Sequence, residues 1–196
     1  MTKYIDLHSH LVLKILNGLN AEPIVGKIKF QKIAFLVLKN FDDIFEFFDF
    51  KPHKFGPFSE SLDYALEESK SKEESIIENE TIKITEIGKA KLSNLDSISN
   101  LNVKEKINKE LIEKTIDTIK EDFKNFTGKE ILAFIYKSFP DYIDDSIIAD
   151  SIDYKNIFLG LYERGELGIS KIAELMGWEF QKAYDFIRKN AKLLIL

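Results

Sequence analysis

The sequence predicts a mainly α-helical chain with one small β-hairpin. Apolar residues recur at helical spacing along most of its 196 residues, whereas residues 76–84 alternate in the manner of two short paired strands. Helices, then a small hairpin, then a helix is the order expected of a winged-helix-like N-terminal domain. Near the C-terminus, a short helix, a glycine-containing turn and a second amphipathic helix form the pattern of a helix-turn-helix.

These patterns divide the chain into three predicted segments. Residues 1–98 form the winged-helix-like domain, residues 99–153 a long linker helix with a second helical segment, and residues 154–196 the helix-turn-helix module. Hydrophobic residues make up 44% of the chain, which is enough for one domain with a full core and a small second module.

Composition excludes several classes of function. The chain has no cysteine, which excludes disulfides, thiol catalysis and zinc sites built on thiolates. A formal net charge of −5 excludes a uniformly basic nucleic-acid-binding surface, although not a local basic face. No apolar stretch reaches the roughly 20 residues that span a bilayer, and Asp6, His8 and His10 interrupt the apolar run at the N-terminus. We therefore expect a cytoplasmic protein with no membrane contact and no cofactor.

The first half of the chain gives six local predictions. Residues 4–19 have helical spacing, and the next helix, "KIKFQKIAFLVLKNF", is apolar nearly all round, which indicates a buried central helix. Residues 45–50 are rich in phenylalanine and suggest a short extended segment. Ser59 can cap the helix that follows. Ser71 and Glu74 have capping-box spacing and predict one more short helical turn, and Thr85 starts a helix after the hairpin.

The second half begins with a predicted amphipathic helix over residues 103–126. Its apolar stripe suits either a homodimer contact or packing within the chain. The stripe consists of Ile107, Leu111, Ile119 and Phe123. Thr127 and Glu130 form a capping box ahead of another helix. The acidic stretch that follows Pro140 lacks the glycine and the final glutamate of a calcium loop, so we expect a solvated loop.

The string Asp6-Leu7-His8-Ser9-His10 matches the opening of a metal-dependent hydrolase. Such an enzyme needs further histidine and carboxylate ligands, but the chain has only one more histidine, His53. On a helix, residues two apart diverge by about 200°, so His8 and His10 cannot share a metal ion. We interpret the string as part of a half-exposed helix.

The turn "KFGPFS" allows two interpretations. Phe55 and Phe58 can be exposed to a protein partner. Alternatively, Gly56 supplies a positive φ and Pro57 fixes the next turn, so that the two aromatic rings close the core.

The helix-turn-helix pattern is the strongest functional signal. From residue 155 to residue 196, seven basic and five acidic side chains give a charge of about +2. The candidate DNA-binding residues are Ser170, Lys171, Trp178, Gln181, Lys182, Arg188 and Lys189. Glutamine can read adenine, and lysine can contact guanine or phosphate. Glu179 and Asp185 on the same helix would repel phosphates, so docking of a protein alone is the competing interpretation.

Two resemblances to known families accompany these signals. Three runs resemble the Panacea antitoxin-like and YwgA-like families: "GKIKFQKIAFLVLKNF", "FDFKPHKFGPFSESLDYALE" and "TIKITEIGKAKL". The run "GKEILAFIYKSFPDY" resembles the continuation in YwgA-like proteins, and the four runs together cover about residues 26–142. Residues 155–192 resemble small prokaryotic antitoxin-type proteins that share an LY-x-x-G run followed by K-A-A-E-L-x-G, with Ile172 replacing one alanine. The resemblances imply a regulatory, non-enzymatic role and supply no catalytic residue.

The sequence therefore favours an antitoxin-type transcriptional regulator. Its C-terminal module would bind double-stranded DNA, and its N-terminal domain would bind a toxin-like or regulatory protein partner. The alternative is an adaptor or antitoxin that binds protein and no DNA.

Overall fold

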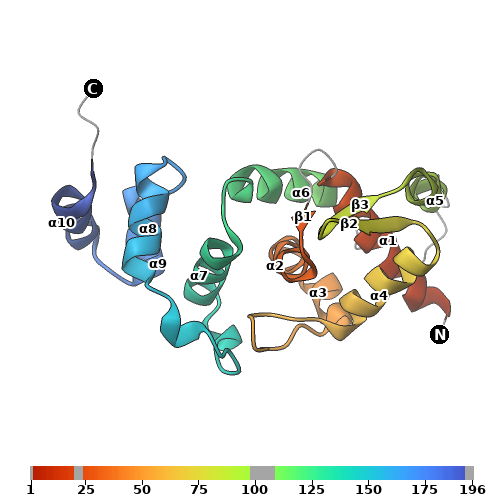
Figure 1. The fold of residues 1–196 in the computed structure, drawn as a ribbon, viewed down its shortest axis with the longest axis horizontal. Helices are drawn as coiled ribbons and strands as arrows, with labels where there is room; N and C mark the ends of the chain where they lie inside the picture. The colour runs from red at the N-terminus through yellow and green to blue at the C-terminus, as the bar shows by residue number, and fades with distance from the viewer. Residues whose placement is uncertain (1, 20–23, 98–108, 193–196) are drawn as a thin grey trace. The chain divides into compact units, whose positions relative to one another are not determined.

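The computed structural model describes residues 2–19, 24–97 and 109–192. Within these ranges the chain is mainly helical with a small antiparallel sheet, as predicted (Figure 1). It forms two compact units, one made of residues 1–51 and 57–124 and the other of residues 52–56 and 125–196. The division falls inside the segment 99–153, after its first helix.

The first unit alternates helices with a three-stranded sheet. Its elements are α1 (Thr2–Gly18), β1 (Ile24–Val25), α2 (Lys27–Leu38), α3 (Asp42–Phe48), α4 (Glu60–Ser71), β2 (Ser75–Glu78), β3 (Thr81–Ile84), α5 (Glu86–Ser97) and α6 (Lys109–Phe123). The predicted hairpin is confirmed: β2 and β3 pair with Ser75 opposite Ile84, and Asn79 and Glu80 form the turn with φ of 48° and 64°. The short strand β1, which the sequence did not predict, pairs with β3, so the sheet order is β1-β3-β2.

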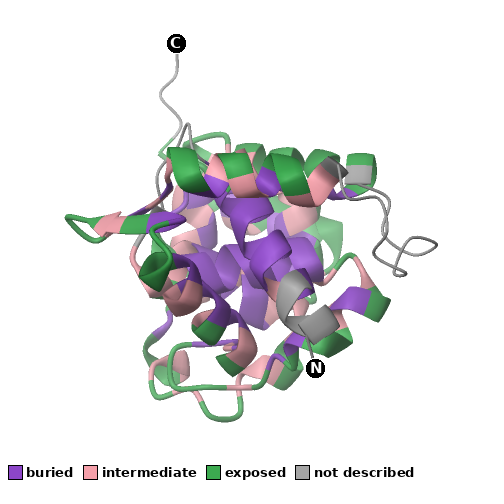
Figure 2. Cartoon of the chain, turned by 90° about the vertical axis from the view of Figure 1, so that its right-hand side faces the viewer, coloured by how far each residue is buried: buried purple, intermediate pink, exposed green. Residues whose placement is uncertain are grey.

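Helix α2 is buried as the sequence predicts. All nine residues from Phe30 to Leu38 are buried, because α3, α6 and β1 pack against it. Helix α1 contacts α4, α5, α6 and β3. Figure 2 shows the buried stretches running through the middle of this group of helices, with exposed residues on the outer turns.

A polar cluster around the buried Lys14 joins three helices of this unit. The ammonium of Lys14 in α1, whose side chain is only 4% exposed, lies 3.3 Å from Asp96 in α5 and 2.8 Å from Glu113 in α6. His10 Nε2 lies 2.9 Å from the same Asp96 carboxylate. Because a buried charge without a counter-charge is costly, this cluster fixes the positions of α5 and α6 against α1.

Two local predictions for this unit are wrong. The segment around Phe48 is a helix, α3, because Ile44 and Phe48 are four residues apart and bury one helical face in the core. No capping box forms at Ser71, because its hydroxyl donates back to the Glu68 carbonyl and α4 ends there. The Glu74 carboxylate instead accepts hydrogen bonds of 2.7 and 2.9 Å from Lys91. By contrast, Ser59 caps α4 as predicted.

The apolar stripe of α6 is also different from the predicted one. The buried residues are Ile112, Ile116 and Phe123, whereas Leu111 is 49% exposed. Ile119 is half-buried, and Ile107 with the first part of the predicted helix lies outside the described residues. The apolar residues of this helix lie on two overlapping faces. Packing against α1 and α2 decides which of the two faces is buried.

The second unit consists of four helices and two short 3₁₀ turns. Its helices are α7 (Gly128–Ser138), α8 (Tyr154–Glu163), α9 (Ile169–Met176) and α10 (Phe180–Asn190), and the 3₁₀ turns cover Pro140–Tyr142 and Ala149–Ser151. The capping box before α7 is confirmed, with Thr127 N–H donating to the Glu130 carboxylate at 2.7 Å and Glu130 N–H donating to the Thr127 hydroxyl. Glu130 also pairs with Arg164 at 2.8 Å, which ties the end of α8 to α7.

Across the described ranges, no helix is both long enough and apolar enough to cross a membrane.

The close approach of α5 to the hairpin gives a test of this fold. A Cβ at Gly88 would lie 2.1 Å from the Glu74 carbonyl oxygen, which already accepts the Thr85 N–H, and 2.8 Å from Ile84. We expect Gly88→Ala to lower the free energy of unfolding by about 2 kcal/mol or more, measured by urea denaturation. Gly128→Ala, also in the first turn of a helix but with open space around its Cβ, is the control. Equal stability of the two variants would contradict this packing.

Candidate nucleic-acid interface

The segment predicted to be a helix-turn-helix folds as two helices, α9 and α10, joined by a tight turn. Helix α9 ends at Gly177, which has a φ of +61° and so adopts the left-handed conformation that glycine accommodates best. Trp178 N–H then donates to the Ala173 carbonyl at 2.8 Å, closing the end of the helix. Helix α10 packs on α9 through Ala183 and Ile187, which are the buried residues of α10.

Trp178 belongs to the turn rather than to the second helix. The sequence placed the start of the helix at Trp178, but α10 begins at Phe180, with Glu179 at its N-cap position. The indole ring is half-buried and meets Phe186 edge to face, with ring centroids 5.4 Å apart. Trp178 therefore anchors the turn on α10, and Lys182 Nζ lies 5.0 Å from the centre of its ring.

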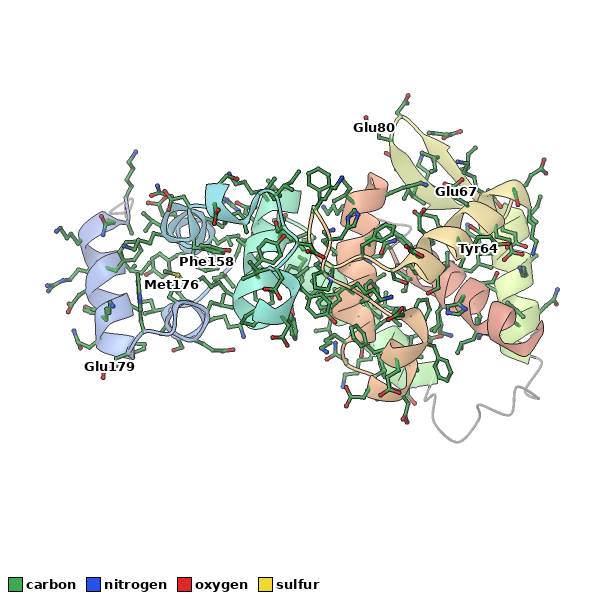
Figure 3. All side chains as sticks on the ribbon, turned by 90° about the horizontal axis from the view of Figure 1, so that it is seen from below. Tyr64, Glu67, Glu80, Phe158, Met176 and Glu179 are labelled. Atoms are coloured by element: carbon green, nitrogen blue, oxygen red, sulfur yellow. The ribbon has the colours of Figure 1, made fainter. Side chains whose placement is uncertain are left out.

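Four of the predicted DNA-binding residues share the outer face of α10. Gln181, Lys182, Arg188 and Lys189 are all exposed. Because a spacing of seven residues is two helical turns, Gln181 lies above Arg188 and Lys182 above Lys189. Figure 3 shows nitrogen-tipped side chains projecting from α10 on the side away from Phe158 and Met176.

One acidic residue lies within this outer face. Asp185 is exposed, and its carboxylate is 3.8 Å from the Arg188 guanidinium. The pair is one helical turn apart, so Asp185 holds Arg188 against the helix surface. Three basic residues and one acidic residue leave α10 with a charge of +2.

The two predicted DNA-binding residues of α9, Ser170 and Lys171, lie in different surroundings. Ser170 is exposed in the first turn of α9. Lys171 is half-buried, forms a 2.7 Å ion pair with Glu174 and lies 5.5 Å from the centre of the Phe134 ring. Lys171 therefore serves a contact between α9 and α7, which sequence spacing alone could not show.

The sequence analysis missed an exposed aromatic pair on α10. Phe180 is 55% exposed and Tyr184 is 42% exposed, and their rings stack with centroids 6.5 Å apart. Their helical spacing alone places both near the apolar face of α10. They lie at its edge instead, since the buried face is centred on Ala183 and Ile187.

The "KFGPFS" turn contributes to both units. Phe55, in the second unit, is 38% exposed. Phe58, in the first, is half-buried, and its backbone pairs with Lys51 in both directions at 2.9 and 3.0 Å. Gly56 has the expected positive φ, at +89°.

Two polar side chains of the buried helix α2 hold the end of this turn. Gln31 donates to the Ser59 carbonyl and accepts from Ser59 N–H, both at 3.1 Å. Lys32 Nζ donates to the Pro57 carbonyl at 3.4 Å, and burial lowers the pKa of this lysine from 10.5 to about 8. These hydrogen bonds therefore hold the motif around Gln31 against the motif around Pro57.

The two N-terminal histidines lie on a helix, as predicted, and point to different elements. The helix is not half-exposed as expected: residues 9–16 are all buried, because α4, α5, α6 and β3 pack against it. His8 Nε2 is 3.0 Å from the Phe47 carbonyl in α3, whereas His10 Nε2 contacts Asp96 in α5. Among the side chains that the structure describes, no group of three or more histidine, aspartate or glutamate residues is placed to hold a metal ion. The side chain of Asp6 lies outside that set.

No protein-family model matches this sequence, no curated protein is significantly similar to it, and no solved structure significantly resembles its fold. The functional interpretation therefore depends on the residues and geometry of the chain itself.

The buried lysine predicts a pH dependence of stability. Between pH 8 and 10.5 the unfolded chain keeps the Lys32 proton and the folded chain has lost it, so the stability rises with pH over this window. Compared with Lys32→Met, we expect the free energy of unfolding of the wild type to rise by up to about 3 kcal/mol between pH 8 and 10.5. Urea denaturation at several pH values measures this difference. Lys29→Met, on the same helix, should keep the wild-type slope. A Lys32→Met variant with that same slope would contradict a buried neutral amine.

Proposed function

We propose that this protein is a non-enzymatic, antitoxin-type transcriptional regulator that binds double-stranded DNA through α10. The observation that carries the proposal is the outer face of α10, where a glutamine and three basic side chains are exposed on the second helix of a helix-turn-helix. In such modules the second helix enters the major groove and its outward residues contact base edges and phosphates.

Charge supports α10 over the other candidate helix. We propose that the first unit is winged-helix-like, a view supported by its order α1-β1-α2-α3-α4-β2-β3 and by its sheet order β1-β3-β2. Helix α4, just before the hairpin, would then occupy the recognition position. It carries four acidic residues against one lysine, a charge of −3, and the hairpin adds Glu78 and Glu80 near its tip. Phosphates would be repelled by both.

The proposed mode of binding assigns each residue a role. Gln181, in the first turn of α10, can make paired hydrogen bonds to the N6 and N7 atoms of adenine. Lys182 and Lys189, two turns apart on one line, would contact phosphates, as would Arg188 once a phosphate replaces Asp185 as its partner. Ser170 at the start of α9 would donate to the backbone, while Lys171 stays with Glu174.

Binding of a short duplex of random sequence tests the proposal. We expect wild-type affinity to fall as salt rises, and Lys182→Glu or Arg188→Glu each to weaken it roughly tenfold and to reduce the slope of log affinity against log salt by about one. Fluorescence anisotropy at several salt concentrations gives both quantities.

Lys155→Glu is the matched control, since it reverses an exposed charge on α8, away from the outer face of α10. It should leave the affinity and the salt slope close to the wild-type values. A wild-type protein that binds no duplex at low salt would refute DNA binding, and equal losses in all three variants would refute the role of α10.

The exposed aromatic pair favours a second candidate function. Phe180 and Tyr184 form an apolar patch on α10, and aromatic residues in such patches are typical of protein interfaces. In this alternative the chain is an adaptor or antitoxin that binds protein and no DNA.

The double variant Phe180→Ser with Tyr184→Ser tests whether the aromatic pair takes part in the electrostatic contact with DNA. Neither residue is charged, so in a DNA-binding regulator we expect the salt slope of duplex binding to be unchanged. A slope that changed as much as in Lys182→Glu would contradict this division of α10 into a basic face and an aromatic edge. Thermal unfolding of the double variant checks that α10 stays folded.

A further inference from the structure

A groove in the first unit is lined by residues that recognise positive charge. It has a volume of about 370 Å³ and is formed by one residue of α1 and five of α4. The lining residues are His8, Glu60, Ser61, Tyr64, Ala65 and Glu68. Its surface is mostly apolar.

Three of these residues form one stripe along α4. Glu60, Tyr64 and Glu68 are spaced by four, so they lie on the same helical face, with their Cα atoms about 6 Å apart from one to the next along the helix axis and about 12 Å from first to last. Tyr64 is 68% exposed, the highest value among the large apolar and aromatic residues described (Figure 3). The ring is therefore presented to solvent between two acidic side chains.

The charges around the groove are unevenly compensated. Asp63 and Glu67 point toward α2, where Lys27 lies 3.5 and 2.5 Å from their carboxylates. Glu68 is paired with Lys72 at 2.6 Å. Glu60 forms no ion pair among the described residues. Lys51 attracts it but is itself paired with Asp49, so the groove keeps negative charge at the end of the stripe nearest Ser61.

We propose that this groove binds a basic segment of a partner protein, with arginine or lysine side chains placed between the Tyr64 ring and the flanking glutamates. An aromatic face attracts a cation, and a carboxylate one helical turn away adds a charge-assisted hydrogen bond. Two basic side chains about 6 Å apart, at positions i and i+4 of a helix, would each contact the ring and one glutamate.

This proposal extends beyond DNA binding and does not depend on it, since it uses residues of the first unit only. Charge complementarity decides the class of occupant. A polyanion is disfavoured by the charge of −3 on α4, and a purely apolar peptide would leave Glu60 without a partner.

Binding of two synthetic peptides to the full chain tests the proposal. Both are capped, alanine-based helical peptides with two arginines. In the first peptide the arginines stand at i and i+4, on one face of the helix, and in the second they stand at i and i+2, on opposite faces. We expect the first to bind roughly tenfold more tightly, and its affinity to fall about tenfold in Tyr64→Ala and several-fold in Glu60→Gln. Isothermal titration calorimetry measures the affinities, and amide chemical shifts of residues 60–68 locate the site.

Glu110→Gln, which removes an exposed carboxylate of α6, is the matched control and should bind the first peptide as the wild type does. Because Tyr64 is exposed, Tyr64→Ala should keep the wild-type unfolding temperature, so loss of binding cannot be assigned to unfolding. Equal binding of both peptides, or binding unaffected by Tyr64→Ala, would overturn the proposal. It would also be overturned if neither peptide binds while Tyr64→Ala dissolves a dimer of the wild type, since a second copy would then occupy the groove.

Discussion

Helix α2 is buried around its whole circumference from Phe30 onward, and much of the first unit follows from that burial. A helix with no solvent-facing side must find partners inside the protein for every polar side chain it carries. Gln31 does so by exchanging two hydrogen bonds with the backbone of Ser59, and Lys32 by donating to the Pro57 carbonyl. Ser59, held in this way, caps α4 and bonds to the Phe48 carbonyl at the end of α3. The position of α4, and so of the acidic stripe on it, depends on two polar residues in the core.

The two helices proposed as binding surfaces, α4 in the first unit and α10 in the second, have opposite charges. Helix α4 has a charge of −3 and α10 a charge of +2, although the whole chain has a modest net charge of −5. These charges are the basis of both proposals, a polyanion at α10 and a basic segment at α4. Separation of the two surfaces onto different units also keeps the acidic residues of α4 out of the helix-turn-helix module.

Local signals in the sequence were sufficient where a few neighbouring residues decide the structure. Ser59 and the Thr127–Glu130 box cap their helices as predicted, Gly177 ends α9, and the Asn79–Glu80 pair turns the hairpin, because each of these depends on backbone groups within a few residues. Predictions failed where residues far away in the sequence decided the structure. The Phe48 segment became helical to bury one face, Glu74 bonded to Lys91 in place of Ser71, and α6 buried Ile112 and Ile116 in place of Leu111.

The sequence by itself determined the mainly helical class, the hairpin, the two C-terminal helices joined at Gly177, and four polar residues on one face of α10, because periodicity and capping are local properties of the chain. Only the tertiary structure decided which helical faces are free. It assigned Lys171 to a contact with Glu174, placed Trp178 in the turn, left Phe180 and Tyr184 exposed, and presented Tyr64 between two glutamates. The physical reason is that the exposure of a helical face depends on what packs against it, and those neighbours lie far away in the sequence.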